Sequence, residues 1–181
     1  CDHDVVEESN LHRQLIHDAA HIGVNKADSA KKRILAQNSS IHIESVEDKF
    51  TVLNAAMLTR KVDVVVDATD NVETRYLIND ACIRENKVLV SGSAVGMEGQ
   101  ISVFVPHQGP CYRCLYPRPS SLSSCKNCAD AGVLGPIPGA IGCFQAMEVI
   151  KVLLKRQDLD STLIPIQHPD STFPPASKMQ V

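Results

Sequence analysis

The chain has no tryptophan and few other aromatic residues, with three tyrosines and four phenylalanines among 181 residues. A hydrophobic core must therefore be built mainly from valine, isoleucine, leucine and alanine, and the hydrophobic content of 44% is enough for one. The net charge is only −3, and the chain has neither a basic run nor a series of stacking aromatic residues. Because these features support binding to a nucleic-acid backbone, we expect no direct nucleic-acid binding.

Long apolar runs are also missing from the sequence. No stretch approaches the roughly 20 apolar residues of a membrane span, and no signal peptide is visible. The seven cysteines are odd in number and clustered, unlike the evenly spaced cysteines of a secreted disulfide domain. We therefore expect no membrane association, a cytoplasmic location, and cysteines that bind metal or carry thiol chemistry.

Helical and strand-like patterns alternate along the chain. Helices are predicted at 25–37, 52–59 (with Thr51 as the N-cap), 71–85 and 139–156, and strands at 41–46, 62–66, 88–90 and 100–105. The strand at 62–66 is expected to be buried on both faces, the strand at 100–105 to be antiparallel, and Cys82 and Cys143 to lie in the core. This order predicts an α/β fold with a doubly wound, Rossmann-like, mostly parallel sheet. We expect one domain over residues 1–157, irregular loops over 106–138, and an irregular tail over 158–181.

Ligands on such a sheet bind beyond the carboxyl ends of the strands. Asp67, Asp70 and Asn71 follow the apolar run at 62–66, and Asp2 would take the same place if a strand preceded it. A carboxylate there can accept hydrogen bonds from ribose hydroxyls, as we expect of Asp2, or bind Mg²⁺, as we expect of Asp70. Each acid also fits a plainer role, since Asp2 suits a solvated turn and Asp70 a helix cap.

Two cations complete a possible nucleotide site. Arg13 carries a planar fork of donors that suits phosphate oxygens, and Lys26 lies at a predicted helix start as a point charge. Taken singly, each is more often a surface cation. Together with the carboxylates, they predict a site for a nucleoside triphosphate with its metal.

Four cysteines form two CxxC pairs, Cys111/Cys114 and Cys125/Cys128, with ten residues between the pairs. Thiolate pairs at this spacing close readily on a tetrahedral Zn²⁺, so a four-cysteine site is one interpretation. Cys128 also precedes the segment ADAGVLG and could instead act as a nucleophile. The plain alternative is four loop thiols without metal.

Several longer motifs resemble a known family: DHDVVEESNLHRQ, GVNKADSA, DATDN, SGSAVGMEGQISVF, GPCYRCLYP, NCADAGVLGP and GCFQAMEVIK. They resemble the ThiF/MoeB ubiquitin-activating-type enzymes, and within these the branch that serves molybdenum-cofactor synthesis and tRNA thiolation. The resemblance runs from Asp2 to about Leu154. It implies a Rossmann-like enzyme that uses ATP and Mg²⁺ to adenylate the C-terminal glycine of a ubiquitin-like sulfur carrier, with release of pyrophosphate.

The resemblance also implies roles for individual residues. Asp2 resembles the ribose acceptor, and Asp70, with Asn71 beside it, resembles the magnesium-linked acid. The phosphate-contacting residues it implies are Ser9, Asn10, Leu11, His12, Arg13 and Lys26. Cys111 and Cys114 resemble half of a structural Zn²⁺ site, and Cys128 resembles the thiol that acts during sulfur transfer. The implied partners are the sulfur carrier, a sulfur-donating desulfurase and a second copy in a homodimer.

The sequence departs from the family pattern in three places. No glycine-rich loop precedes Asp2, so the first strand–helix unit is expected to be missing. No second CxxC pair follows Cys143, so Cys125 is a possible substitute ligand for Zn²⁺. The tail from residue 158 does not resemble the final strands of the family. These departures leave open a non-catalytic fragment, a carrier-binding pseudoenzyme, a zinc-binding module, or an activating enzyme for another ubiquitin-like modifier. A nicotinamide-dependent oxidoreductase is disfavoured because the dinucleotide glycine fingerprint is absent.

Overall fold

The computed structural model describes residues 1–117, 132–157 and 178–180. The chain divides into two compact units, Cys1–Thr51 and Val52–Val181. All the strands among the described residues belong to the second unit.

The first unit contains one full helix, α1 (Lys26–Gln37), and two short 3₁₀ turns, η1 (Glu8–Asn10) and η2 (Ala19–His21). Asn25 is the N-cap of α1, and its side-chain oxygen accepts hydrogen bonds from the amides of Ala27 and Asp28. A capping asparagine satisfies amides that have no partner within the helix. The helix predicted at 25–37 is therefore confirmed.

The strand predicted at 41–46 is wrong. The amide of Asp2 donates to the carbonyl of Val46 over 3.0 Å, but residues 41–46 form no ladder with another strand among the described residues. Alternation of apolar and polar residues produces a strand only where a neighbouring chain offers regular backbone partners. Ile41 is accordingly exposed.

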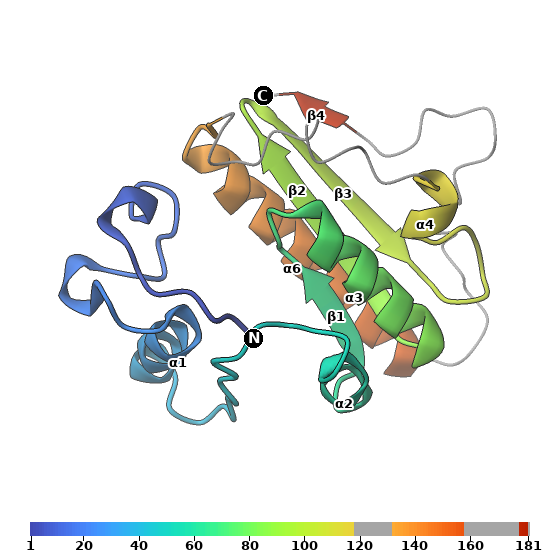
Figure 1. Ribbon diagram of the computed structural model, residues 1–181, viewed down its shortest axis with the longest axis horizontal. Helices are drawn as coiled ribbons and strands as arrows, with labels where there is room; N and C mark the ends of the chain where they lie inside the picture. The colour runs from blue at the N-terminus through green and yellow to red at the C-terminus, as the bar shows by residue number, and fades with distance from the viewer. Residues whose placement is uncertain (118–131, 158–177, 181) are drawn as a thin grey trace. The chain divides into compact units, whose positions relative to one another are not determined.

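The second unit contains an α/β sheet with flanking helices (Figure 1). Its elements are α2 (Ala55–Arg60), β1 (Val64–Asp67), α3 (Val72–Arg84), β2 (Val88–Val95), β3 (Glu98–Phe104), α4 (Tyr112–Leu115), α6 (Pro136–Gln157) and β4 (Lys178–Gln180). The strand order is β1-β2-β3-β4. β1 and β2 are parallel, with Asp67 opposite Ser91, whereas β2–β3 and β3–β4 are antiparallel. The α/β class is confirmed, but among the described strands the sheet is mixed and not mostly parallel.

Helices α3 and α6 cover opposite faces of this sheet (Figure 1). Leu89 and Val90 of β2 are fully buried between these layers. On the α6 side, Gly92 and Gly99 leave the space that Gln145 and Ile141 fill, because a Cβ at either glycine would overlap those side chains. The missing Cβ atoms thus allow α6 to approach the strands closely.

Other expectations about the second unit hold in part. β1 forms where predicted but is not buried on both faces, since 48% of Val66 is exposed. The helix predicted at 52–59 begins later, at Ala55, and its N-cap is Asn54, so Thr51 does not cap it. Cys82 is buried in the core as expected, but Cys143 is exposed on α6.

The expectation that no apolar stretch approaches the length of a membrane span is wrong for helix α6. By length and composition alone, its segment Pro136–Leu154 is long and apolar enough to cross a membrane, with a mean hydropathy of 1.5. The segment packs on the sheet through Ile137, Ile141 and Val152. Core helices of soluble proteins can have the same length and apolar composition, so one such helix is weak evidence for a membrane span.

The regions expected to be irregular contain some regular structure. Within 106–138, α4 forms one short helix and α6 begins at Pro136. In the tail, Lys178–Gln180 forms β4, which differs from the expected irregular chain at these three residues. Residues 118–131 and 158–177 lie outside the described part of the chain.

Candidate functional site

A buried carboxylate marks the carboxyl end of β1. Asp67 is 0% exposed, and its Oδ1 accepts hydrogen bonds from the amide and the hydroxyl of Thr69 over 2.9 and 2.7 Å. Its Oδ2 accepts from Arg75 Nε over 2.9 Å and from Ser91 Oγ over 2.7 Å. A buried charge needs such partners, because an unpaired one would be strongly destabilising. Asp67 is therefore a structural centre of this edge of the sheet.

Arg75 of α3 connects this centre to two backbone segments. Its Nη2 donates to the carbonyl of Thr69 over 2.7 Å and to the carbonyl of Gly92 over 2.9 Å. The guanidinium group thus binds the end of β1, the following turn and the middle of β2 at once. Sequence reasoning did not single out Arg75, and no local spacing signals this role.

The turn after β1 carries Asp70 and Asn71. Asn71 is the N-cap of α3, with its Oδ1 accepting from the amide of Thr74 over 2.8 Å, so the cap is Asn71 and not Asp70. Asp70 is exposed and has no hydrogen-bond or ion-pair partner among the described residues. A carboxylate that is free at the carboxyl end of a strand suits a hard cation such as Mg²⁺, which prefers oxygen ligands.

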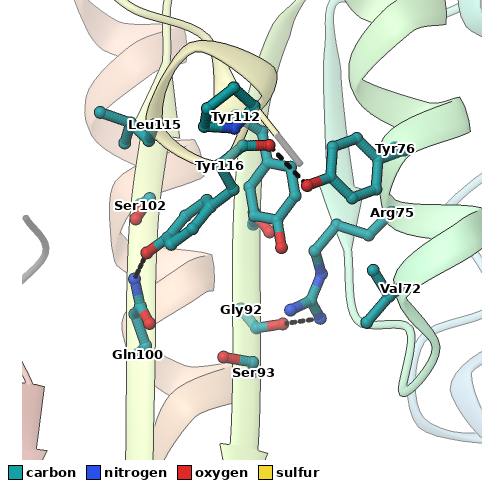
Figure 2. A pocket seen from close by; sticks show the side chains of 12 residues that line it. Val72, Arg75, Tyr76, Gly92, Ser93, Gln100, Ser102, Tyr112, Leu115 and Tyr116 are labelled. Carbon is teal, nitrogen blue, oxygen red and sulfur yellow. Dashed lines mark hydrogen bonds between the residues drawn. The ribbon is translucent and has the colours of Figure 1, made fainter. Parts of the chain in front are cut away.

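A pocket of about 450 Å³ lies over β2 and β3 next to Arg75 (Figure 2). Its lining includes all three tyrosines of the chain, Tyr76, Tyr112 and Tyr116. The Tyr76 hydroxyl donates to the carbonyl of Tyr116, and Gln100 Nε2 donates to the Tyr116 hydroxyl over 3.0 Å. The walls thus combine aromatic and neutral polar side chains with the positive charge of Arg75.

The tyrosine cluster was also missed by sequence reasoning, although a signal was present. Tyr112 lies within the CxxC pair and Tyr116 lies two residues after it, and a separation of four residues places two side chains on one side of a helical turn. Their rings are 4.8 Å apart between centroids.

In the first unit, Lys26 already has an ion-pair partner. Its Nζ lies 3.2 Å from Asp4 Oδ2, and the Lys26 side chain is only 13% exposed. Asp2 Oδ1 accepts from the amide of Asp4 over 2.9 Å, as in the turn role considered for it. Potential ligand atoms of Asp2, His3 and Asp4 lie within 4.8 Å of one another, but the Lys26 ammonium competes with a cation for Asp4.

The segment implied to contact phosphates folds onto itself. Asn10 is buried, and its Oδ1 accepts from Arg13 Nη2 over 3.0 Å. The carbonyl of Ser9 accepts from Arg13 Nη1 over 3.3 Å and lies 3.0 Å from His12 Nδ1, while Leu11 is partly buried. The structure thus brings Ser9, Asn10, His12 and Arg13 together, with the Arg13 fork held at the end of η1.

The two thiols of Cys111 and Cys114 lie 3.6 Å apart at the start of α4. Burial raises the pKa of Cys111, but hydrogen bonds from the Cys114 amide, the Cys114 thiol and Asn79 outweigh it, so the pKa lies below its ordinary value. Two thiols that converge in this way fit half of a tetrahedral Zn²⁺ site. The described residues contain no second cysteine pair, and Cys125 and Cys128 lie outside them.

The predicted triphosphate site draws on both units. Asp2, the Ser9–Arg13 segment and Lys26 belong to the first unit, and Asp70 and Asn71 to the second. Their assembly into one site stays a prediction.

Comparison of the sequence with known proteins gives close matches. The chain is 50% identical over 151 residues to "Adenylyltransferase and sulfurtransferase MOCS3-1" of Zea mays, covering 83% of this chain and 32% of that protein. It is 51% identical over 156 residues to "Adenylyltransferase and sulfurtransferase MOCS3" of Anopheles gambiae, covering 86% of this chain and 35% of that protein. The chain thus spans about a third of the length of the curated relatives it matches.

Solved structures confirm the fold. The E. coli MccB structure with ATP aligns with a TM-score of 0.68 at 24% identity, covering 85% of this chain and 47% of that one. The MccB structure with MccA-N7isoASN aligns with a TM-score of 0.70 at 23% identity, covering 85% and 48% of the two chains. The model of the ThiF family matches residues 1–180. The chain therefore belongs to the ThiF family.

Proposed function

We propose that this chain is the ATP-binding part of an adenylyltransferase that activates the C-terminal glycine of a ubiquitin-like sulfur-carrier protein. The observation that carries the proposal is the exposed carboxylate of Asp70 just beyond the carboxyl end of β1, which has no partner among the described residues, in a chain of the ThiF family. The names of the relatives from Zea mays and Anopheles gambiae support the same reaction.

The chemistry requires charge stabilisation. A carboxylate is a poor electrophile, and joining its oxygen to AMP, with loss of pyrophosphate, creates a good leaving group. The reaction first brings two anions together, so cations must offset their repulsion. Asp70 would hold Mg²⁺, which neutralises phosphate charge when bound.

The first unit would supply the remaining nucleotide contacts. Arg13 presents a planar fork that two carbonyl-type oxygens already orient, which favours phosphate binding at its remaining donors. Lys26 would share its charge between Asp4 and a phosphate oxygen. Asp2 would accept from the ribose hydroxyls, and Ser9, Asn10, Leu11 and His12 would shape the segment around the phosphates.

The second part of the proposal concerns sulfur transfer. The Cys128 thiol would attack the acyl-adenylate of the carrier, forming a thioester and releasing AMP, and a desulfurase partner would be the source of the sulfur. The resulting thiocarboxylate would serve molybdopterin synthesis and tRNA 2-thiolation in the cytoplasm. Cys111 and Cys114 would hold half of a structural Zn²⁺ site, and the protein would act as a homodimer.

An ATP–pyrophosphate exchange assay with the full-length protein tests the adenylation step. We expect carrier-dependent exchange that falls at least about a hundredfold in Arg13→Ala and Asp70→Ala, the scale of losing one transition-state charge contact. Cys128→Ala should leave exchange intact and abolish thiocarboxylate formation. Lys61→Ala, at the C-cap of α2 and outside the proposed contacts, is the control and should keep exchange near the wild-type rate.

Two results would contradict the proposal. No exchange above background with the carrier and Mg²⁺ present would favour a carrier-binding pseudoenzyme. Exchange only with a different modifier would assign the protein to another ubiquitin-like system. Metal analysis addresses the zinc role separately, since Cys114→Ser should lower the bound zinc.

A further inference from the structure

A glutamine on the α6 face of the sheet binds the end of β1 and the neighbouring strand β2, just before the turn that carries Asp70. Gln145 of α6 is 4% exposed, and its Nε2 donates to the carbonyl of Asp67 over 2.8 Å and to the carbonyl of Val90 over 3.2 Å. Asp67 is the last residue of β1, and Val90 lies on the adjacent strand β2. One amide group therefore joins two neighbouring strands at the point where β1 gives way to the turn.

A glutamine at this place needs a reason, because α6 otherwise meets the sheet through apolar side chains such as Ile137 and Ile141. Burying an amide is unfavourable unless its hydrogen bonds are satisfied. Gln145 satisfies this condition through backbone carbonyls of two strands. Replacing it with an apolar residue would leave those carbonyls without this donor.

Gly92 makes room for the glutamine. A Cβ atom at Gly92 would lie 2.6 Å from Gln145 Oε1 and 2.7 Å from Gln145 Nε2, which no side-chain contact tolerates. A substitution at Gly92 or at Gln145 can therefore disturb the position of the amide group.

Asp67 is thus fixed from both faces of the sheet. Its carboxylate is held by Thr69, Arg75 and Ser91 on the α3 side, and its carbonyl is held by Gln145 on the α6 side. Asp70 follows three residues later and has no partner of its own among the described residues. Its location therefore depends on how firmly the chain is held at Asp67 and at the cap residue Asn71.

We propose that Gln145 is a positioning residue that fixes the turn at Ala68–Asn71 and so places the Asp70 carboxylate for the metal. This inference rests on the proposed adenylation function. Gln145 itself is buried and donates to backbone carbonyls, so it acts on Asp70 through the backbone of Asp67. Only the affinity of the site for Mg²⁺, and not that for the carrier, should depend on it.

The test compares Gln145→Met, which keeps the side-chain size but removes the donor, with wild type in the full-length protein. Hydrogen exchange should rise about fivefold or more at the Thr69 amide, as expected for losing one buried hydrogen bond. In the pyrophosphate exchange assay, the Mg²⁺ concentration for half-maximal rate should rise by a similar factor, while KM for the carrier stays unchanged. Gly92→Ala, which displaces the amide without removing it, should give the same two effects.

Glu148→Gln is the matched control, because it changes an acid to an amide on the same helix, at a residue that contacts Lys151 near the surface. It should alter neither readout. The inference would be overturned if Gln145→Met left hydrogen exchange at the Thr69 amide unchanged. It would also be overturned if hydrogen exchange rose evenly over the whole sheet while the Mg²⁺ dependence of the rate did not change. If wild type shows no pyrophosphate exchange, the proposed function fails, whereas the hydrogen-exchange pattern still decides whether Gln145 positions the turn.

Discussion

Removal of the Asp67 carboxylate should strongly destabilise the second unit. In Asp67→Ala, the four hydrogen bonds from Thr69, Arg75 and Ser91 are lost together. The Arg75 side chain is only 13% exposed, so its charge would stay largely buried without its carboxylate. Breaking a buried pair from one side costs about 3–5 kcal/mol.

The chain offers a matched comparison for this magnitude. Asp80 also pairs with an arginine, Arg113, over 2.6 Å, but the two side chains are 49% and 46% exposed. Exposed pairs contribute at most about 1 kcal/mol, because water screens the charges and both side chains lose freedom. Asp80→Ala should therefore cost far less than Asp67→Ala, although both remove an aspartate that pairs with an arginine.

Urea denaturation followed by circular dichroism measures both variants. Since domains of this size have a free energy of unfolding of about 5–15 kcal/mol, the Asp67 variant is expected to lose a large share of it. If Asp67→Ala fails to express, Asp67→Asn and the double variant Asp67→Asn/Arg75→Met provide a milder series. Equal losses in Asp67→Ala and Asp80→Ala would refute the reasoning that burial decides the magnitude.

Two further predictions concern titrating groups. Burial, with a smaller contribution from the Asp67 charge, raises the pKa of Cys82 to about 12. Iodoacetamide at about pH 8 should therefore label the exposed Cys143 in the folded protein and leave Cys82 unmodified. Equal labelling of the two cysteines in mass spectrometry would contradict this prediction. The hydrogen bond from Arg113 lowers the pKa of Asp80 below its ordinary 3.8, so the pair stabilises the fold above pH 3.8 and this contribution is lost as the pH falls through the lowered pKa. Asp80→Asn should therefore reduce stability at about pH 7 but not at about pH 2, and a difference that persists in acid would rule out this pair as its source.

Local signals accounted for much of the second unit. The helices α3 and α6 and the strand β3 form close to where periodicity predicts them, because this pattern reflects interactions between residues near in sequence. β2 begins at Val88 as predicted but runs on to Val95, beyond the predicted end at residue 90. The strand predicted at 41–46 failed because its pattern did not reveal whether a neighbouring strand would pair with it. Cys143 was misplaced for a related reason: a helical pattern shows periodicity but not which side of α6 faces the sheet.

The sequence by itself determined the family and the α/β class, because these follow from motifs and local patterns, whereas the nucleotide-site residues that it indicates stay a prediction. Only the tertiary structure decided that Asp67 is a buried centre held by Arg75, that Gln145 reaches Asp67 across 78 positions of sequence, and that three tyrosines line one pocket. Such contacts arise when distant segments pack together, and no short spacing encodes them. Their energies depend on burial, which exists only after the chain has folded.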